Sequence, residues 1–426
     1  MNSCKWLVRT FLLLSLLSSL PSRAFAQQVQ SNPVLPEHLT MQEAMELMLR
    51  QNPLLLRDQQ NPQIAKGDVI QAGRRPNPDF EIVSESYPLF ESSPGPFFNN
   101  QELVVRAGQT IETAGRRGKR VRVARQELAA SESGVQDTVR QLKLELKRRY
   151  YVVVLAKAQR DLAGEILKQF DDIIRLNEAR FKQGELSGLE INRIRAERLR
   201  FFNDVLDADL QLKNAKTDLL EVLGVFDLNT VFDVSEPLAA SSLTVDLPQL
   251  QTQALENRPD LRAERQRLER NRQDLQLQKA ERIPNVTPFF GYKRDFGANT
   301  AAFGVSIPLP LFNRNQGGIA RASAQIQQQQ YETSRLDLSV RRDVQAAYQT
   351  LQTQADRVRA LEQQYVPSAR STREIAQQSY RLGALDLIGF LDAERIYRET
   401  LRAYNLALFD YQTSIFQLEA AVGKEF

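Results

Sequence analysis

Histidine and cysteine, the side chains most often used as metal ligands and nucleophile–base partners, each occur once in this sequence, as His38 and Cys4. A histidine metal cluster, a facial triad and a histidine-based catalytic pair each need more such residues. Gly115 and Gly118 enclose two arginines and lead into a helix, unlike the Gly-Lys-Ser/Thr pattern of a phosphate-binding loop. We therefore expect no enzyme activity, no cofactor and no metal site.

The first 26 residues have the pattern of a signal peptide. Lys5 and Arg9 precede an apolar run, residues 11–20, and the small-residue segment 24–26 follows it. We expect cleavage after Ala26, which removes Cys4 and leaves an exported chain that burial and oligomerisation must stabilise without disulfides. No later segment offers the ~20 consecutive apolar residues of a membrane helix. If the mature protein lies in a membrane, it does so as strands.

The charge balance gives no argument for nucleic acid as a partner. The full sequence has 56 basic and 52 acidic residues and a net charge of +4. Removing the leader also removes Lys5, Arg9 and Arg23, so 53 bases face 52 acids and the net charge falls to +1.

The mature chain is built from two copies of one plan, and we place the first repeat at 27–246 and the second at 247–426. Each copy opens with a short amphipathic helix that ends at a proline, Pro53 or Pro259, and these prolines lie 206 residues apart. A polar helix follows, to about Gly73 in the first copy and Arg282 in the second.

Each polar helix ends at prolines, after which a pair of strands is predicted. The expected strands are roughly Asp79 to Tyr87 and Gln101 to Ile111 in the first copy, and Asn285 to Arg294 and Thr300 to Leu309 in the second. A loop with Pro94, Gly95 and Pro96 joins the first pair, and residues 295–299 join the second. Strands of this length cross an outer membrane when tilted, which takes ~9 to 11 residues.

Long helices are predicted from Lys119 to about Lys182 and from Gly318 to about Arg381, where apolar residues keep steps of three, four or seven. About 60 residues make a helix of about 90 Å, far longer than a globular domain needs. Pro367 lies inside the second, where we expect a kink or a break. Returning helices follow, from Leu189 to Leu223 and from Leu387 to Ala421.

Four strands cannot close a barrel, and open strand edges are not tolerated in hydrocarbon, so several chains must supply strands together. A dimer would give eight strands and a trimer twelve, of which twelve leave room for a lumen. The charge-rich helices, with one narrow apolar seam, suit the wall of a helical tube. They would also suit a periplasmic coiled-coil scaffold without channel activity, whose apparent strands are only loops.

The sequence resembles the TolC-type outer membrane efflux family over essentially all of the mature chain. The residues that carry the resemblance are Asn52-Pro53 and Arg258-Pro259 at the helix openings, the glycine turns, the first strand exit 109–112 with Gly115–Gly118, and the second exit 306–317. Segment 72–78 and that second exit are most similar to the cobalt-zinc-cadmium resistance branch.

The resemblance implies a mainly α fold with a β-barrel part: a trimeric channel with a shared twelve-stranded transmembrane barrel and a long coiled-coil helical barrel. It implies an outer membrane location with a long periplasmic extension. The implied function is the exit duct of a tripartite efflux pump, opened at its periplasmic tip by an adaptor and an inner membrane pump. Heavy-metal cations or small toxic compounds would be the cargo.

The resemblance also implies site residues. The periplasmic tips would lie at the glycine turns, where the adaptor docks on Gly184, Glu185, Leu186 and Ser187 and on Gly383, Ala384, Leu385 and Asp386. The alternative is that each glycine merely supplies a left-handed turn.

Tyr380 stands where the family places a gating tyrosine, and Glu190 where it places the acidic partner. The family's arginine is replaced by Leu385. Asp392 stands at a constriction position, while Gly389 replaces the second acid. A ring of three Asp392 carboxylates would favour cations. The alternative for Asp392 is an ordinary ion pair with Arg395.

Overall fold

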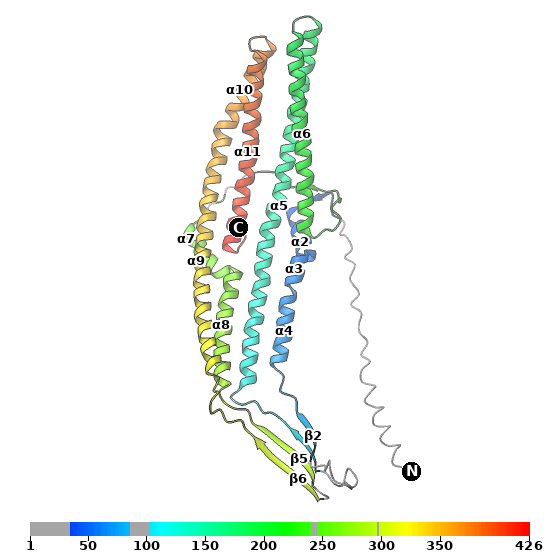
Figure 1. The fold of residues 1–426 in the computed structure, drawn as a ribbon. Helices are drawn as coiled ribbons and strands as arrows, with labels where there is room; N and C mark the ends of the chain where they lie inside the picture. The colour runs from blue at the N-terminus through cyan, green and yellow to red at the C-terminus, as the bar shows by residue number, and fades with distance from the viewer. Residues whose placement is uncertain (1–34, 86–101, 240–242, 244, 296–297) are drawn as a thin grey trace, which may run out of the picture. The chain divides into compact units, whose positions relative to one another are not determined.

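The computed structural model describes residues 35–85, 102–239, 243, 245–295 and 298–426. The predicted signal peptide and the loop containing Pro94, Gly95 and Pro96 lie outside these residues. Helices make up most of the described chain, with short strands between them, as the sequence predicted (Figure 1).

Both halves contain short helices, then a pair of strands, then a long helical hairpin, and they differ in the short strands β1 and β4 of the first half and the π-helical turn of the second. The first half contains β1 (His38–Leu39), α2 (Met41–Gln51), α3 (Pro53–Asp58), α4 (Gln60–Ala72), β2 (Asp79–Glu85), β3 (Glu102–Gly108), α5 (Arg116–Lys182), α6 (Gly188–Leu223) and β4 (Asp233–Val234). The second half contains α7 (Leu247–Asn257), α8 (Pro259–Ala280), β5 (Thr287–Asp295), β6 (Ala298–Ser306), α9 (Gln316–Ala360), the π-helical turn η1 (Leu361–Tyr365), α10 (Val366–Arg381) and α11 (Leu387–Val422).

Local hydrogen bonds start the first helices. Thr40 and Glu43 form a capping box, in which the Glu43 carboxylate accepts from the Thr40 backbone at 2.9 Å and the Thr40 hydroxyl accepts from the Glu43 backbone at 3.2 Å. The Asn52 side chain accepts from the amides of Leu54 and Leu55, and Pro53 takes the first helical position.

The predicted interruption near Pro367 is a π-helical turn. Proline has no amide hydrogen to donate to the preceding turn, and its ring clashes with the carbonyl four residues earlier. The π-helical turn η1 ends at Tyr365, two residues before Pro367, and its wider backbone spacing accommodates the proline.

Four of the strands form an antiparallel sheet in the order β2-β3-β5-β6, while the short strands β1 and β4 pair with each other in parallel. Its strands are shorter at the exits than the sequence predicted: β6 ends at Ser306 instead of Leu309, because Pro308 and Pro310 cannot donate to a ladder. Likewise β3 ends at Gly108, and Ile111 makes only an isolated bridge to Val286.

Helices next to the sheet follow the same order as the strands. Helix α4 contacts α5, α5 contacts α8, and α8 contacts α9. At the far end, α6 contacts α5, α5 contacts α11, and α11 contacts α10. In the described chain, β2 and β6 are therefore the edges of the sheet, while α4 and α9 are the edges of the helical layer beside it (Figure 1). None of the described helices combines the length and the apolar character needed to cross a membrane.

Each half contains an equivalent joint, where the end of its last helix packs against the end of its first short helix. Gly224 ends α6 with a φ of 75°, and a Cβ there would lie 2.8 Å from the Gln51 carbonyl oxygen, so only glycine fits. Beside it, the side-chain nitrogen of Asn52 donates to the Val222 carbonyl at 2.8 Å. Gly423 ends α11 in the same way, with a φ of 77° and a Cβ position 3.3 Å from the Arg258 backbone.

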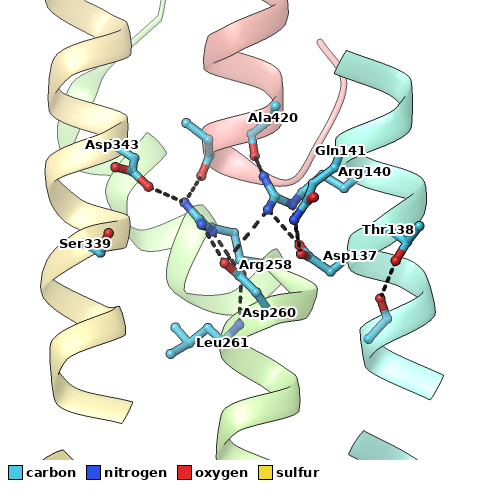
Figure 2. A network of polar contacts seen from close by, with 12 residues as sticks. Asp137, Thr138, Arg140, Gln141, Arg258, Asp260, Leu261, Ser339, Asp343 and Ala420 are labelled. Carbon is cyan, nitrogen blue, oxygen red and sulfur yellow. Dashed lines mark hydrogen bonds and ion pairs between the residues drawn. The ribbon is translucent and has the colours of Figure 1, made fainter. Parts of the chain in front are cut away.

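The second joint carries charge where the first is neutral. Arg258 is buried and pairs with Asp260 at 2.6 Å and with Asp343 on α9 at 3.2 Å (Figure 2). Arg140 on α5 pairs with Asp137 and donates to the Ala420 carbonyl of α11 at 2.8 Å (Figure 2). The network therefore connects α5, α8, α9 and α11.

Burial alone would raise the pKa of Asp260, but the hydrogen bonds and charge of Arg258 lower it below the usual value. A carboxylate with a lowered folded-state pKa stabilises the fold above its unfolded pKa, and that contribution is lost as pH falls through the folded pKa.

We predict that Asp260→Asn lowers the midpoint of thermal unfolding at pH 7 and that the difference from wild type shrinks between about pH 5 and pH 3. The measurement is circular dichroism melting at several pH values. Asp392→Asn, at an exposed ion pair, is the matched control and should change the midpoint little. A difference independent of pH would contradict the assignment.

Candidate functional site

The two long helical hairpins end in turns of the same geometry. Gly184 has a φ of 79° and Gly383 a φ of 76°, conformations that favour glycine. Bonds back to the preceding helix close both turns: the Glu185 amide donates to the Arg180 carbonyl, and the Ala384 amide donates to the Ser379 carbonyl.

Each turn presents some of its predicted contact residues and tucks one inward. Leu186 and Leu385, each two residues before the next helix begins, are half-buried and pack on an apolar core below the tips. The other members of the predicted set are exposed; they are Gly184, Glu185, Ser187, Gly383, Ala384 and Asp386.

One core joins both hairpins of the chain. It contains Ile166, Phe170, Ile173 and Ile174 of α5, Ile194 and Phe201 of α6, and Tyr380, Leu387 and Phe390 of the other hairpin. Because both hairpins contribute to one apolar cluster, separating them would expose it to water.

Tyr380 is buried in this core, with only 5% of its surface exposed. Its hydroxyl donates to the Asn177 side-chain oxygen of α5 at 2.7 Å, and the Asn177 nitrogen donates to the Ile173 carbonyl at 2.8 Å. The Tyr380 ring stacks on Phe390, with centroids 5.1 Å apart. Burial raises the pKa of Tyr380, so the hydroxyl stays a donor at neutral pH.

Arg180 lies beside the ring of Tyr380. Its guanidinium lies 6.0 Å from the Tyr380 ring centroid and donates to the Arg381 carbonyl at 2.5 Å. A cation on α5 thus contacts the end of α10, next to the tyrosine.

Glu190 does not bond to Tyr380 within the chain. Its carboxylate accepts from the Ser187 hydroxyl at 2.8 Å and from the Ser187 backbone at 3.1 Å, which makes a capping box for α6. These hydrogen bonds lower the pKa of Glu190, so it is charged at neutral pH. The family resemblance implies a hydrogen bond between Tyr380 and Glu190, either between helices of one chain or between subunits. Within the chain it is not formed, and a bond between subunits stays a prediction.

A second, ionic layer lies behind the tyrosine. Arg373 of α10 pairs with Glu394 of α11 at 2.8 Å, and both side chains are about nine-tenths buried. Arg373 also donates to Gln169 of α5. Burial raises the pKa of Glu394, and the charge of Arg373 opposes that effect.

The ionic layer extends to α6. Arg398 of α11 pairs with Asp204 of α6 at 3.1 Å, and Arg402 reaches the same carboxylate at 3.4 Å. Arg398 also lies 5.4 Å from the centroid of the Phe201 ring. The two hairpins are therefore joined by a buried neutral hydrogen bond and by ion pairs.

Asp392 is half exposed and pairs with Arg395 at 2.6 Å, which is the alternative that its spacing allowed. Arg395 also pairs with Glu399 at 3.1 Å. Within one chain the Asp392 carboxylate is thus partly neutralised. Among the described residues, no group of three histidine, cysteine, aspartate or glutamate side chains is placed to hold a metal ion.

Sequence reasoning missed Asn177, Arg373 and Glu394. Asn177 lies seven residues after the buried Phe170, and Arg373 lies seven residues before Tyr380. A polar residue in register with a buried heptad position was the available signal, because such residues are retained in coiled coils where they pair across the seam.

The sheet has one apolar and one polar face, as strand alternation and register dictate. Large exposed side chains on the apolar face are Phe80, Ile82, Phe290, Tyr292, Phe303 and Val305. The opposite face carries ion pairs between strands: Arg106 pairs with Glu81, and Lys293 pairs with Glu102.

Known proteins share this organisation. A family model described as outer membrane efflux protein matches residues 44–225 and 250–424. The chain is 25% identical over 392 residues to the cobalt-zinc-cadmium resistance protein CzcC of Cupriavidus metallidurans, and the match covers 90% of each protein. It is 25% identical over 343 residues to the outer membrane protein TolC of Vibrio cholerae, covering 76% of this chain and 75% of that protein.

Solved structures share the fold. A crystal structure of CusC superposes with a TM-score of 0.76 at 20% identity, covering 90% of this chain and 92% of that one. The outer membrane protein VceC from Vibrio cholerae gives a TM-score of 0.74 at 20% identity, covering 91% and 96%. Because the family model matches most of the sequence in both halves, this chain belongs to the outer membrane efflux protein family.

Proposed function

We propose that this protein is the outer membrane exit duct of a tripartite efflux pump, a passive channel without enzyme activity. The observation that carries the proposal is the two-faced sheet attached to a long helical body. Its apolar face leaves Phe80 69%, Phe290 63% and Phe303 84% exposed, which a protein surrounded by water would bury. Lipid suits that face, and water suits the ion-paired face.

Oligomerisation completes the duct. The edge strands β2 and β6 each have one neighbour in the described sheet, and an open edge is not tolerated in hydrocarbon. Pairing β6 of one subunit with β2 of the next closes the sheet, and three subunits give twelve strands around a lumen. The same step places α9 of one subunit beside α4 of the next, so the helices close into a tube below the membrane.

The periplasmic scaffold is the second candidate function. The exposed, amphipathic, four-stranded sheet argues against it, because a helical rod surrounded by water would gain nothing from a large exposed apolar surface. Expression of the full chain and separation of outer membrane from soluble fractions tests the choice. Trimers in the outer membrane fraction that survive mild detergent and dissociate only on heating support the duct, whereas a soluble dimer would refute it.

We place the gate at the hairpin tips. The Tyr380–Asn177 bond and the Arg398–Asp204 ion pair hold the two hairpins of a subunit together, while Glu190 is exposed at the start of α6, where a neighbouring subunit would meet it. A docking adaptor would contact the two exposed turns, at Gly184, Glu185 and Ser187 and at Gly383, Ala384 and Asp386. Leu186 and Leu385 would transmit the contact to the core on which they pack.

For cargo we propose heavy-metal cations, on the similarity to the cobalt-zinc-cadmium resistance protein. Selection would belong to the pump. The duct would contribute only the charge of its constriction, where three copies of Asp392 could meet.

Replacing Tyr380 by Phe should open the closed channel more often. The change leaves the Asn177 oxygen buried without its donor, which costs about 1 to 3 kcal/mol, enough to shift a closed–open equilibrium roughly 5-fold to 150-fold. Conductance of single trimers in planar bilayers measures it. Tyr331→Phe, on an exposed tyrosine, is the control. Unchanged closed-state conductance in Tyr380→Phe would remove this bond from the gate.

If three Asp392 carboxylates form a ring in the channel, substitutions at Asp392 and Arg395 should change cation block in opposite directions. Asp392→Asn should weaken the block of the channel by multivalent cations, because three carboxylates are lost. Arg395→Gln should strengthen it, since Asp392 loses the partner that lies 2.6 Å away. The half-blocking concentration of a trivalent cation is the measurement. Equal block in wild type and both variants would mean that Asp392 does not line the constriction.

A further inference from the structure

Four linkers join the sheet to the helices, and they lie together as one band, which we call the collar. We define the collar as residues 72–78, 109–120, 280–286 and 307–316. Hydrogen bonds connect its parts: the Arg120 guanidinium donates to the Arg74 carbonyl at 3.1 Å, and that of Arg116 to the Glu281 carbonyl at 3.0 Å. The Asn315 side chain donates to the Glu281 carboxylate at 3.1 Å.

The collar is far more basic than the rest of the protein. It contains eight basic residues and two acidic ones. The bases are Arg74, Arg75, Arg116, Arg117, Lys119, Arg120, Arg282 and Arg314. Because the mature chain as a whole is close to neutral, this excess of six positive charges is a local feature. It requires a compensating anion or strong solvation.

The two acids of the collar do not neutralise its exposed arginines. Glu112 pairs with Arg120, and Glu281 accepts from Asn315. Arg75, Arg282 and Arg314 are exposed. The side chains of Arg75 and Arg282 have no hydrogen bond or ion pair within the described chain. The Arg314 guanidinium donates only to the Pro310 carbonyl, at 3.2 Å.

Exposed apolar side chains interleave with these arginines. Ile283 is 51% exposed and follows Arg282, while Phe312 is 91% exposed and precedes Arg314 by two residues. Leu309 and Leu311, which follow the end of β6 along the chain, are 75% and 65% exposed. Apolar groups with cations beside them, at the end of an apolar sheet, match the depth at which acyl chains end and phosphates begin.

We propose that the collar binds the headgroups of anionic phospholipids in the leaflet where the strands leave the membrane. The proposal rests on the proposed function, because it takes the sheet to lie in a bilayer. Arg75, Arg282 and Arg314 contact lipid phosphates, for which guanidinium groups offer paired donors. Leu309, Leu311 and Phe312 insert among the upper parts of the acyl chains. The ligand is a lipid phosphate, held by side chains that make few contacts within the chain.

The test uses the full mature trimer in nanodiscs of phosphatidylcholine alone or with one quarter phosphatidylglycerol. The variant combines Arg75→Gln, Arg282→Gln and Arg314→Gln. The control removes the same charge from exposed arginines outside the collar, with Arg50→Gln, Arg148→Gln and Arg370→Gln. The readouts are the temperature at which trimers dissociate and the lipids that native mass spectrometry finds on the released trimer.

The anionic lipid should raise the dissociation temperature of wild type and control by several degrees, and 1 M salt should abolish most of that rise. The collar variant should show less than a third of the rise and should lose its retained phosphatidylglycerol. Equal responses of the collar variant and wild type would overturn the proposal. So would a changed cation-to-anion selectivity with an unchanged lipid response, which would place the arginines at the lumen. If wild type forms no inserted trimer in either lipid, it is the proposed duct that fails.

Discussion

The open edges of β2 and β6 are the constraint on which the other features depend. A strand edge in hydrocarbon leaves backbone donors and acceptors without partners, and in the proposed duct the apolar face of this sheet lies in hydrocarbon. Both demands are met at once if the edges pair with other copies of the chain. The same pairing would bring the helices of neighbouring copies together, because α4 leads into the edge strand β2 and α9 follows the edge strand β6. A single physical requirement at the sheet thus sets the symmetry of a helical body several times longer.

The tips divide their interactions between two kinds of bond. Tyr380 and Asn177 are uncharged and buried, so their hydrogen bond depends little on salt or on pH near neutrality. The ion pairs behind them cost desolvation when they form, and they leave an uncompensated buried charge if only one partner moves away. Such a layer opposes separation of the two hairpins inside one subunit, in the same direction as the Tyr380–Asn177 bond. The exposed groups, Glu190 and the two turns, are the ones to which the proposed function assigns contacts with neighbouring subunits and an adaptor.

Much of the fold could be predicted from the sequence because its signals are local. Prolines 53 and 259, the glycine turns and the long apolar periodicity fix helix ends within a few residues of those observed. The strand exits were less accurate, since the prolines that follow β6 end the ladder earlier than the apolar pattern does. Asn177, Arg373 and Glu394 were missed for a different reason. Which helix faces which in a bundle decides whether a polar residue is buried, and a sequence period carries no information about the neighbour.

The five-residue π-helical turn between α9 and α10 has a consequence for how this protein can vary. A residue added to a helix rotates everything beyond it by about 100°. The turn therefore sets the angular phase of α10 independently of α9, so that Arg373 and Tyr380 face α5 while α9 keeps its own contacts with α7 and α8. Deleting one residue from this turn would leave the sequence of the tip unchanged but rotate its side chains away from their present contacts. Insertions and deletions should thus be more harmful here than most substitutions, although no residue of the turn is buried.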